Sequence, residues 1–155
     1  MKPIVINVDD DKEHRDTVQE VLDRDYDVRS FDRPEAALSA IRPLKEAIEE
    51  GLLKVIVVTD QHMPGMTGPE FLAQLQREGI DVPVIIVIAT AEENVRNELQ
   101  AHGVVIDKFI PKPVNMAGLQ YIVGDALRHH HDRNSPKLSF TDRLGNIDPD
   151  ICRGG

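Results

Sequence analysis

The amino-acid sequence predicts an α/β domain built on a five-stranded parallel sheet with helices on both faces. Five short apolar segments alternate with five segments of helical periodicity along the chain, which is the order that strand-helix-strand units require. The central apolar segments are nearly continuous, as in strands that are buried on both faces. Acids and a lysine follow the ends of several segments, so we expect one polar site at the carboxyl edge of the sheet.

The expected strands are apolar runs of strand length that lie between turn-forming residues. They are residues 4–8, 26–31, 55–59, 82–89 and 104–110. The second is the most polar, and we expect it near an edge of the sheet. The fourth is apolar throughout and should be buried on both faces.

The expected helices carry apolar side chains at helical spacing. They are residues 12–24, 34–50, 69–78, 91–102 and 114–128. Pro34 stands where a first-turn proline belongs. Pro43 interrupts the second helical segment, so this helix should be kinked or divided into two short ones. Gly51 is expected to end it.

Length and composition limit the class of protein. The 155 residues suffice for one domain with a short appendage. A formal charge of −9 argues against direct nucleic-acid binding. No apolar stretch reaches the ~18–20 residues of a membrane span, and the start of the chain lacks the features of a signal peptide. With Cys152 as its single cysteine, we expect a cytoplasmic protein.

The end of the chain departs from the alternating pattern. We therefore divide the sequence into a domain at residues 1–128 and a C-terminal tail or linker at residues 129–155, or the start of a missing output region. Three consecutive histidines at residues 129–131 do not face one way on a helix, which disfavours specific metal coordination. Their default interpretation is a solvated helix terminus that complements the helix dipole.

Three carboxylates are expected to meet at the carboxyl edge of the sheet. Asp9 and Asp10 follow the first strand, and Asp60 closes the third. These acids would repel one another without a cation, and Mg²⁺ prefers all-oxygen sites with carboxylate pairs. A carboxylate beside Mg²⁺ can itself attack phosphorus. Lys112 offers a charge, and Thr90 a hydroxyl, to the oxygens of an incoming phosphoryl group.

These polar residues belong to four short motifs. They are Asp9-Asp10-Asp11 after the run from Ile4 to Val8, Asp60-x-x-Met63-Pro64-x-x-x-Gly68, Thr90-Ala91, and Lys112-Pro113. In this order, over about residues 2–128, they resemble the receiver domain of bacterial two-component response regulators. The resemblance implies a flavodoxin-like, doubly wound five-stranded parallel sheet with strand order 2-1-3-4-5 and five helices. The long segment around residues 43–53 departs from the family's usual pattern.

The resemblance implies how the acids are used. Asp60 would be phosphorylated by a histidine kinase. Asp9 and Asp10 would hold Mg²⁺, with Asp10 the more direct ligand, and Asp60 and the backbone carbonyl of His62 would complete the protein ligands. Because Asp11 is a third consecutive acid, the choice of the two metal-binding acids rests on matching the strand.

The resemblance also implies a switch. The hydroxyl of Thr90 would move to the phosphoryl group, which Lys112 would bind. Phe109 matches the aromatic switch position and would turn inward when the threonine moves. The peptide bond between Lys112 and Pro113 would be cis.

Simpler structural roles compete with these functional ones. Asp60 could cap the next turn, and Asp10 and Glu13 have the spacing of a helix capping box. The other structural alternatives are Asp11 as a helix cap, which is favoured, Thr90 as a helix N-cap, Lys112 as a solvated loop residue, Phe109 as ordinary core, and His62 as a plain loop side chain.

We expect a receiver that is controlled by phosphorylation and serves as a signalling switch, catalysing its own phosphoryl transfer. The expected partners are a sensor histidine kinase or phosphotransfer protein and an output domain or protein that the sequence does not name. A homodimer through the face of the fourth helix, fifth strand and fifth helix is also expected, whereas direct binding to nucleic acid or membrane is not.

Two other classes of function compete with this interpretation. The first is a phosphorylation-independent interaction module of the same fold, against which the intact set of acids, Thr90 and Lys112 argues. The second is an Asp-nucleophile phosphatase of the haloacid-dehalogenase type. Such an enzyme would need an acid where His62 stands, and no segment of the chain resembles its cap domain.

Overall fold

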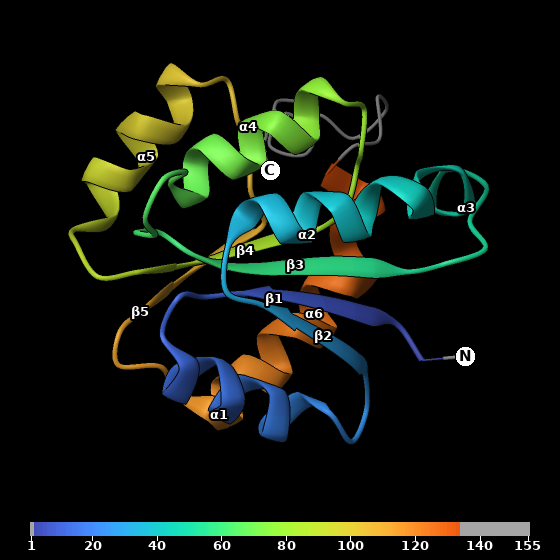
Figure 1. The fold of residues 1–155 in the computed structure, drawn as a ribbon, viewed down its shortest axis with the longest axis horizontal. Helices are drawn as coiled ribbons and strands as arrows, with labels where there is room; N and C mark the ends of the chain where they lie inside the picture. The colour runs from blue at the N-terminus through green and yellow to red at the C-terminus, as the bar shows by residue number, and fades with distance from the viewer. Residues whose placement is uncertain (1, 134–155) are drawn as a thin grey trace, which may run out of the picture.

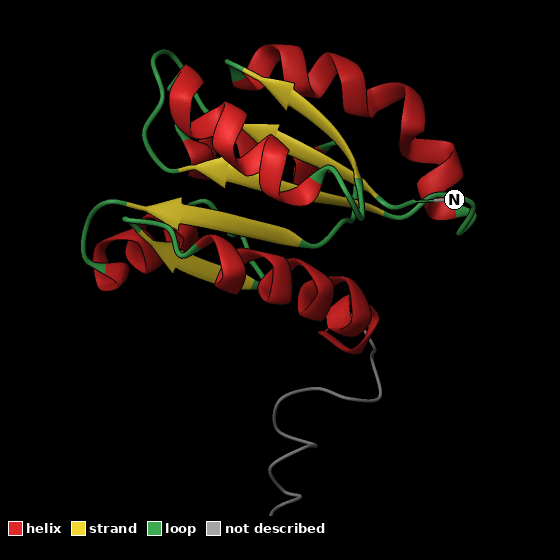
Figure 2. Cartoon of the chain, turned by 90° about the horizontal axis from the view of Figure 1, so that it is seen from below, coloured by secondary structure: helices red, strands yellow, loops and turns green. Residues whose placement is uncertain are grey.

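Residues 2–133 are described by the computed structural model, and one parallel sheet forms their centre. Its strands are β1 (Ile4–Val8), β2 (Asp27–Phe31), β3 (Val55–Asp60), β4 (Val84–Ile88) and β5 (Lys108–Pro111). They lie in the order β2-β1-β3-β4-β5, and every neighbouring pair is parallel, as the arrows in Figure 2 show. The predicted fold class, strand order and edge position of the second strand are confirmed.

Helices cover both faces of this sheet (Figure 1). They are α1 (Lys12–Leu22), α2 (Pro34–Ile41), α3 (Lys45–Glu49), α4 (Gly68–Arg77), α5 (Glu92–Ala101) and α6 (Met116–Arg133). The helices α2, α4 and α5 lie on one face, and α1 and α6 on the other. None of the helices in residues 2–133 has the length and apolar character that crossing a bilayer requires.

The helical segment between β2 and β3 is divided in two, as Pro43 predicts. A 3-10 turn at Arg42–Leu44 contains this proline and separates α2 from α3. Proline lacks the N–H that an α-helix would use and clashes with the preceding turn. The long segment between the second and third strands is therefore helical in two pieces, and it ends at Gly51, which has a positive φ of 74°.

Two apolar cores hold the layers together. Side chains alternate between the faces of a strand, so Ile4 and Ile6 of β1 enter the core beneath α2, α4 and α5, while Val5 enters the core beneath α1 and α6. Phe71 of α4 is fully buried in the first core, and Leu119 of α6 in the second. Burial on both faces explains why the central strands are apolar without alternation.

The fifth strand starts later than the sequence predicts. Regular pairing with β4 covers only Lys108–Pro111, although the apolar run begins at Val104. Asp107 accepts the N–H of Val84 with its side-chain Oδ1 at 2.8 Å, and Val105 is 63% exposed. The first residues of the run therefore form a connection along the edge of the sheet.

The last helix continues past its expected end at residue 128. It reaches Arg133, so residues 129–133 continue the helix. The side chain of His130 is only 14% exposed and lies 3.0 Å from Asp81 Oδ1 and 3.4 Å from Asp107 Oδ2. The interpretation of a solvated terminus is wrong for His130, because a contact with a distant part of the chain is not visible in local sequence. The rest of the expected tail, residues 134–155, lies outside the described residues.

Candidate functional site

Three carboxylates converge where the central strands end. Asp60 is the last residue of β3, and Asp9 and Asp10 directly follow β1, its parallel neighbour. Each of the three offers a ligand oxygen, and these oxygens all lie within 4.8 Å of one another. Asp9 and Asp60 are buried, whereas Asp10 is exposed. The cluster is therefore a recessed acidic site with one open side.

Asp60 is held by two donors on one of its oxygens. Its Oδ1 accepts the backbone N–H of Gln61 at 2.9 Å and lies 3.1 Å from Nζ of Lys112, which follows β5. Burial raises the pKa of Asp60, and the charge of Asp9 adds to this increase, while Lys112 and the Gln61 N–H oppose it. Among the described residues, no hydrogen bond reaches Oδ2 of Asp60.

Asp9 is bound on both oxygens. Its Oδ1 accepts the N–H of Asp11 at 2.9 Å, and its Oδ2 contacts Nδ1 of His14 on α1. Burial opposes ionisation of Asp9, but these two hydrogen bonds and the positive charges nearby outweigh it, so the pKa of Asp9 is lowered. The same contact with Asp9 raises the pKa of His14. His14 Nε2 is buried and has no hydrogen-bond partner among the described residues.

The loop after Asp60 fits only because residue 68 is glycine. Gly68 N–H donates to the carbonyl of Gln61 at 2.8 Å, which brings the loop back over the end of β3. A Cβ at position 68 would lie 2.4 Å from the backbone carbonyl oxygen of Asp60. The motif glycine is therefore required by a close approach of backbone to backbone.

The hydroxyl of Thr90 is bound by a neighbouring side chain. Thr90 follows β4, and its Oγ1 lies 3.1 Å from Nε2 and 3.2 Å from Oε1 of Gln61. The side chain of Gln61 also accepts the N–H of Ala89 at 3.3 Å. Gln61 is 3% exposed, so its amide forms a buried link between the ends of β3 and β4.

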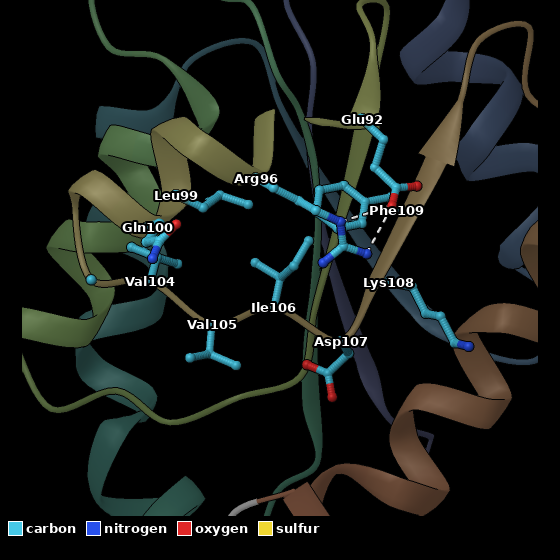
Figure 3. A pocket seen from close by; sticks show the side chains of 11 residues that line it. Glu92, Arg96, Leu99, Gln100, Val104, Val105, Ile106, Asp107, Lys108 and Phe109 are labelled. Atoms are coloured by element: carbon cyan, nitrogen blue, oxygen red, sulfur yellow. Dashed lines mark hydrogen bonds and ion pairs between the residues drawn. The ribbon is translucent and has the colours of Figure 1, made fainter. Parts of the chain in front are cut away.

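Phe109 lies on β5, beside a groove that α5 and the chain before β5 form (Figure 3). The groove has a volume of about 830 Å³ and is lined by Glu92, Arg96, Val105 and Phe109, among others. The Arg96 guanidinium lies 4.6 Å from the centre of the Phe109 ring, within the range of a cation–π contact, and it also pairs with Glu92 at 2.7 Å. Phe109 is half-buried against the first core, so core packing accounts for only part of its surroundings.

The acidic cluster has the chemistry of a site for a hard divalent cation. Three carboxylates face one lysine charge, and the raised pKa of Asp60 reflects burial and the repulsion of Asp9. A cation would relieve this repulsion, and oxygen donors with one open side suit Mg²⁺, which usually retains several waters. His62 follows in the same loop with an exposed side chain. Its backbone carbonyl is therefore the atom of this residue that could bind the cation.

The comparison with protein families decides the identity of this arrangement. The family model for the response regulator receiver domain matches residues 5–123. The chain belongs to this family. It is thus a receiver domain of two-component systems, and receiver domains typically bind Mg²⁺ at an acidic pocket such as the one that Asp9, Asp10 and Asp60 form here.

Individual relatives agree with the receiver domain assignment. The two-component response regulator ARR21 of Arabidopsis thaliana is 29% identical over 87% of this chain and 21% of its own length. Hybrid signal transduction histidine kinase D of Dictyostelium discoideum is 34% identical over 72% of this chain and 7% of its own length. The crystal structure of FixJ-N is 25% identical, with a TM-score of 0.66 over 83% of this chain and 96% of that chain. The chain thus spans a small part of these two sequence relatives and nearly all of FixJ-N.

Several structural alternatives from the sequence can now be judged for the receiver domain. Asp11 is the N-cap of α1, and its side chain accepts the N–H groups of Glu13 and His14, as favoured. Asp10 is therefore not the cap. Thr90 is not a helix cap either, because Ala91 occupies that position and has no side-chain capping bond. Lys112 is not a solvated loop residue, since it pairs with Asp60. Its peptide bond to Pro113 is cis, as expected.

Two residues of the receiver site, Gln61 and His14, were not predicted from the sequence. Gln61 stands between two motif positions, and its position beside Asp60 was the only available hint. His14 lies in the first turn of α1, where a helical residue near the end of β1 can reach back to Asp9. Both act through side-chain contacts between separate elements, which spacing along the chain does not reveal.

Proposed function

We propose that Asp60 accepts a phosphoryl group from a phosphohistidine partner and that this modification switches partner binding. The observation that carries the proposal is the asymmetry of Asp60. Its Oδ1 is engaged by Lys112 and Gln61, while Oδ2 accepts no hydrogen bond from the described residues. One oxygen is thereby oriented, and the other is available to react.

The transfer is a direct displacement at phosphorus. Oδ2 of Asp60 attacks, an oxygen–phosphorus bond forms, the phosphorus–nitrogen bond of the donor breaks, and the departing imidazole takes up a proton. Lys112 holds Oδ1 and balances charge on the phosphoryl oxygens. Burial of Asp60 strengthens these interactions, because the low local dielectric screens them less than water does.

Mg²⁺ would be held by Asp9, Asp10, Asp60 and the backbone carbonyl of His62. When bound, it supplies positive charge that neutralises the carboxylates and the phosphoryl oxygens. The hydrogen bonds to both oxygens of Asp9 keep that carboxylate ionised and oriented, as its lowered pKa reflects. Asp10 is exposed and is accessible to an ion that keeps its waters.

The switch would connect the site to the groove beside α5. Thr90 would bring its hydroxyl to the phosphoryl group, and Phe109 would turn inward and leave the Arg96 guanidinium. The partners proposed for the resulting surface are an output domain or protein and a second copy of this chain, through the face of α5, β5 and α6. A sensor histidine kinase or phosphotransfer protein would supply the phosphoryl group. The division into a domain at residues 1–128 and a tail or linker at residues 129–155 remains a prediction.

The test is an intact mass measurement after incubation with a small phosphodonor and Mg²⁺. The expected result is a gain of one phosphoryl group that disappears with EDTA and in Asp60→Asn. Asp107→Asn is the matched control, because it alters a largely buried acid at the opposite edge of the sheet and should still be phosphorylated. If no adduct forms and beryllofluoride with Mg²⁺ also fails to bind, the phosphorylation-independent interaction module replaces this proposal.

A further inference from the structure

Gln61 is fixed in place by its backbone and offers its amide to the Thr90 hydroxyl. Its N–H donates to Val87 O at 3.0 Å and to Asp60 Oδ1 at 2.9 Å, and its carbonyl accepts from Gly68 N at 2.8 Å. With the backbone held on both sides and the side chain buried, the amide has little freedom to follow a moving partner. If the two side chains separate, the one that moves must therefore be Thr90, which is exposed.

The hydroxyl of Thr90 has one proton to donate. In the structure, Oε1 of Gln61 lies 3.2 Å from the hydroxyl oxygen, and Nε2 donates to that oxygen at 3.1 Å. Among the described residues, both hydrogen bonds of this hydroxyl go to Gln61. A phosphoryl oxygen on Asp60 is an acceptor as well, so it would compete with Oε1 of Gln61 for the same proton.

We propose that Gln61 is a positioning residue that holds Thr90 in the resting arrangement and thereby sets how readily the receiver switches. This inference rests on the proposed phosphorylation of Asp60 and names a regulator of that same site. Through its side-chain amide, Gln61 contacts the Thr90 hydroxyl and the N–H of Ala89. It acts by stabilising the state in which Thr90 has not moved, so removing its amide favours the activated state.

The experiment is a beryllofluoride titration with Mg²⁺, because this phosphoryl mimic binds without covalent chemistry. Wild type, Gln61→Met, Thr90→Val and the double variant are compared, and their folding is checked by circular dichroism. Methionine keeps the length and volume of glutamine but removes the hydrogen bonds. Loss of a resting-state hydrogen bond should tighten apparent beryllofluoride binding about fivefold in Gln61→Met.

The double variant separates positioning from a merely structural effect. If Gln61 acts through the Thr90 hydroxyl, Gln61→Met should leave beryllofluoride affinity unchanged in the Thr90→Val background. Equal tightening in both backgrounds would overturn the proposal, and so would unchanged or weaker binding by the single variant. Failure of wild type to bind beryllofluoride would instead count against phosphorylation at Asp60.

A second measurement uses only the unmodified protein, so it does not depend on whether a variant folds. In unmodified protein, the side-chain amide of Gln61 is followed by NMR before and after addition of beryllofluoride and Mg²⁺. The amide protons should exchange slowly with water in the resting protein and faster once Thr90 has left. An amide whose exchange and chemical shift stay the same would overturn the proposal even if Gln61→Met proved unstable.

Discussion

A largely buried carboxylate lies at the carboxyl edge of the sheet, where the strands end, and another lies at the opposite edge, where they begin. These two acids have very different surroundings. At the carboxyl edge, the side chain of Asp60 is 5% exposed, pairs with Lys112 and lies beside two other acids. At the opposite edge, the side chain of Asp107 is 9% exposed. One of its oxygens accepts the N–H of Val84, and the other contacts His130.

This difference shows that burial alone does not identify a reactive acid. Oδ1 of Asp107 completes the pairing between the starts of β4 and β5, and the imidazole of His130 lies between Asp107 and Asp81. Asp60 lies beside two other acids, and burial together with the charge of Asp9 raises its pKa. Crowding of carboxylates around one lysine, more than depth in the protein, distinguishes the candidate site from a structural acid.

The largest expected effect would come from removing Asp107. Asp107→Ala leaves the buried N–H of Val84 without its acceptor, which should lower the free energy of unfolding by about 2 kcal/mol, measured by urea denaturation. Asp107→Asn retains an acceptor oxygen and should lose less. Phosphoryl transfer to the folded variant should persist, and a loss of the adduct in Asp107→Asn would contradict the contrast between the two edges.

The next effect is stabilisation by Mg²⁺ at the carboxyl edge. At ten times its Kd, Mg²⁺ should raise the free energy of unfolding by ~1.4 kcal/mol, because it binds the folded chain through the clustered acids. Thermal unfolding with and without EDTA measures this difference. Asp10→Asn should largely abolish it, while Asp107→Asn should retain it. Equal stabilisation of all three proteins would place the ion elsewhere.

A smaller effect should follow from neutralising Asp60 without metal. Burial holds the pKa of Asp60 above its ordinary value. At neutral pH the ionised carboxylate therefore lowers the free energy of unfolding. Asp60→Asn should therefore be more stable than wild type at pH 7, by less than the stabilisation that Mg²⁺ gives. The difference should shrink as pH falls through the raised pKa. A less stable Asp60→Asn across this range would mean that its ion pair with Lys112 outweighs the repulsion.

The smallest effect concerns an acid at the surface. Arg42 pairs bidentately with Glu78 at 2.8 Å and, with Gln74, lowers the pKa of Glu78 from 4.5 to about 2. The stability that this pair contributes is present above pH 4.5 and is lost as pH falls towards 2. Arg42→Gln should move the titration of Glu78, followed by NMR, back towards its ordinary value with little change in Tm. An unchanged titration would assign the shift to Gln74.

The sequence predicted the fold well because its strands are buried on both faces. The continuous apolar runs of β1, β3 and β4, together with the helical spacing between them, admit few arrangements other than a doubly wound sheet. The residues of the candidate site were predictable because strand ends in such a sheet share one edge. Pro43 likewise predicted the division of its helix, since its effect is local.

The parts that sequence could not predict depend on contacts between distant side chains. The run from Val104 looked like strand throughout, but regular pairing with β4 starts only at Lys108, and Asp107 before it binds Val84 through both its backbone and its side chain. The helix past residue 128 is accompanied by the contacts of His130 with two acids from other connections. Gln61 became visible as a partner of Thr90 only once the ends of β3 and β4 lay together.

The close approach at Gly68 has a consequence for natural variation. A single methyl group there would press against the main chain of Asp60, so any missense change in this codon should disturb the acidic edge although residue 68 has no side chain to lose. His62, in the same loop, is exposed and can vary widely in type. Lineages of this protein should therefore diversify the exposed side chains of the loop while its path past β3 stays fixed.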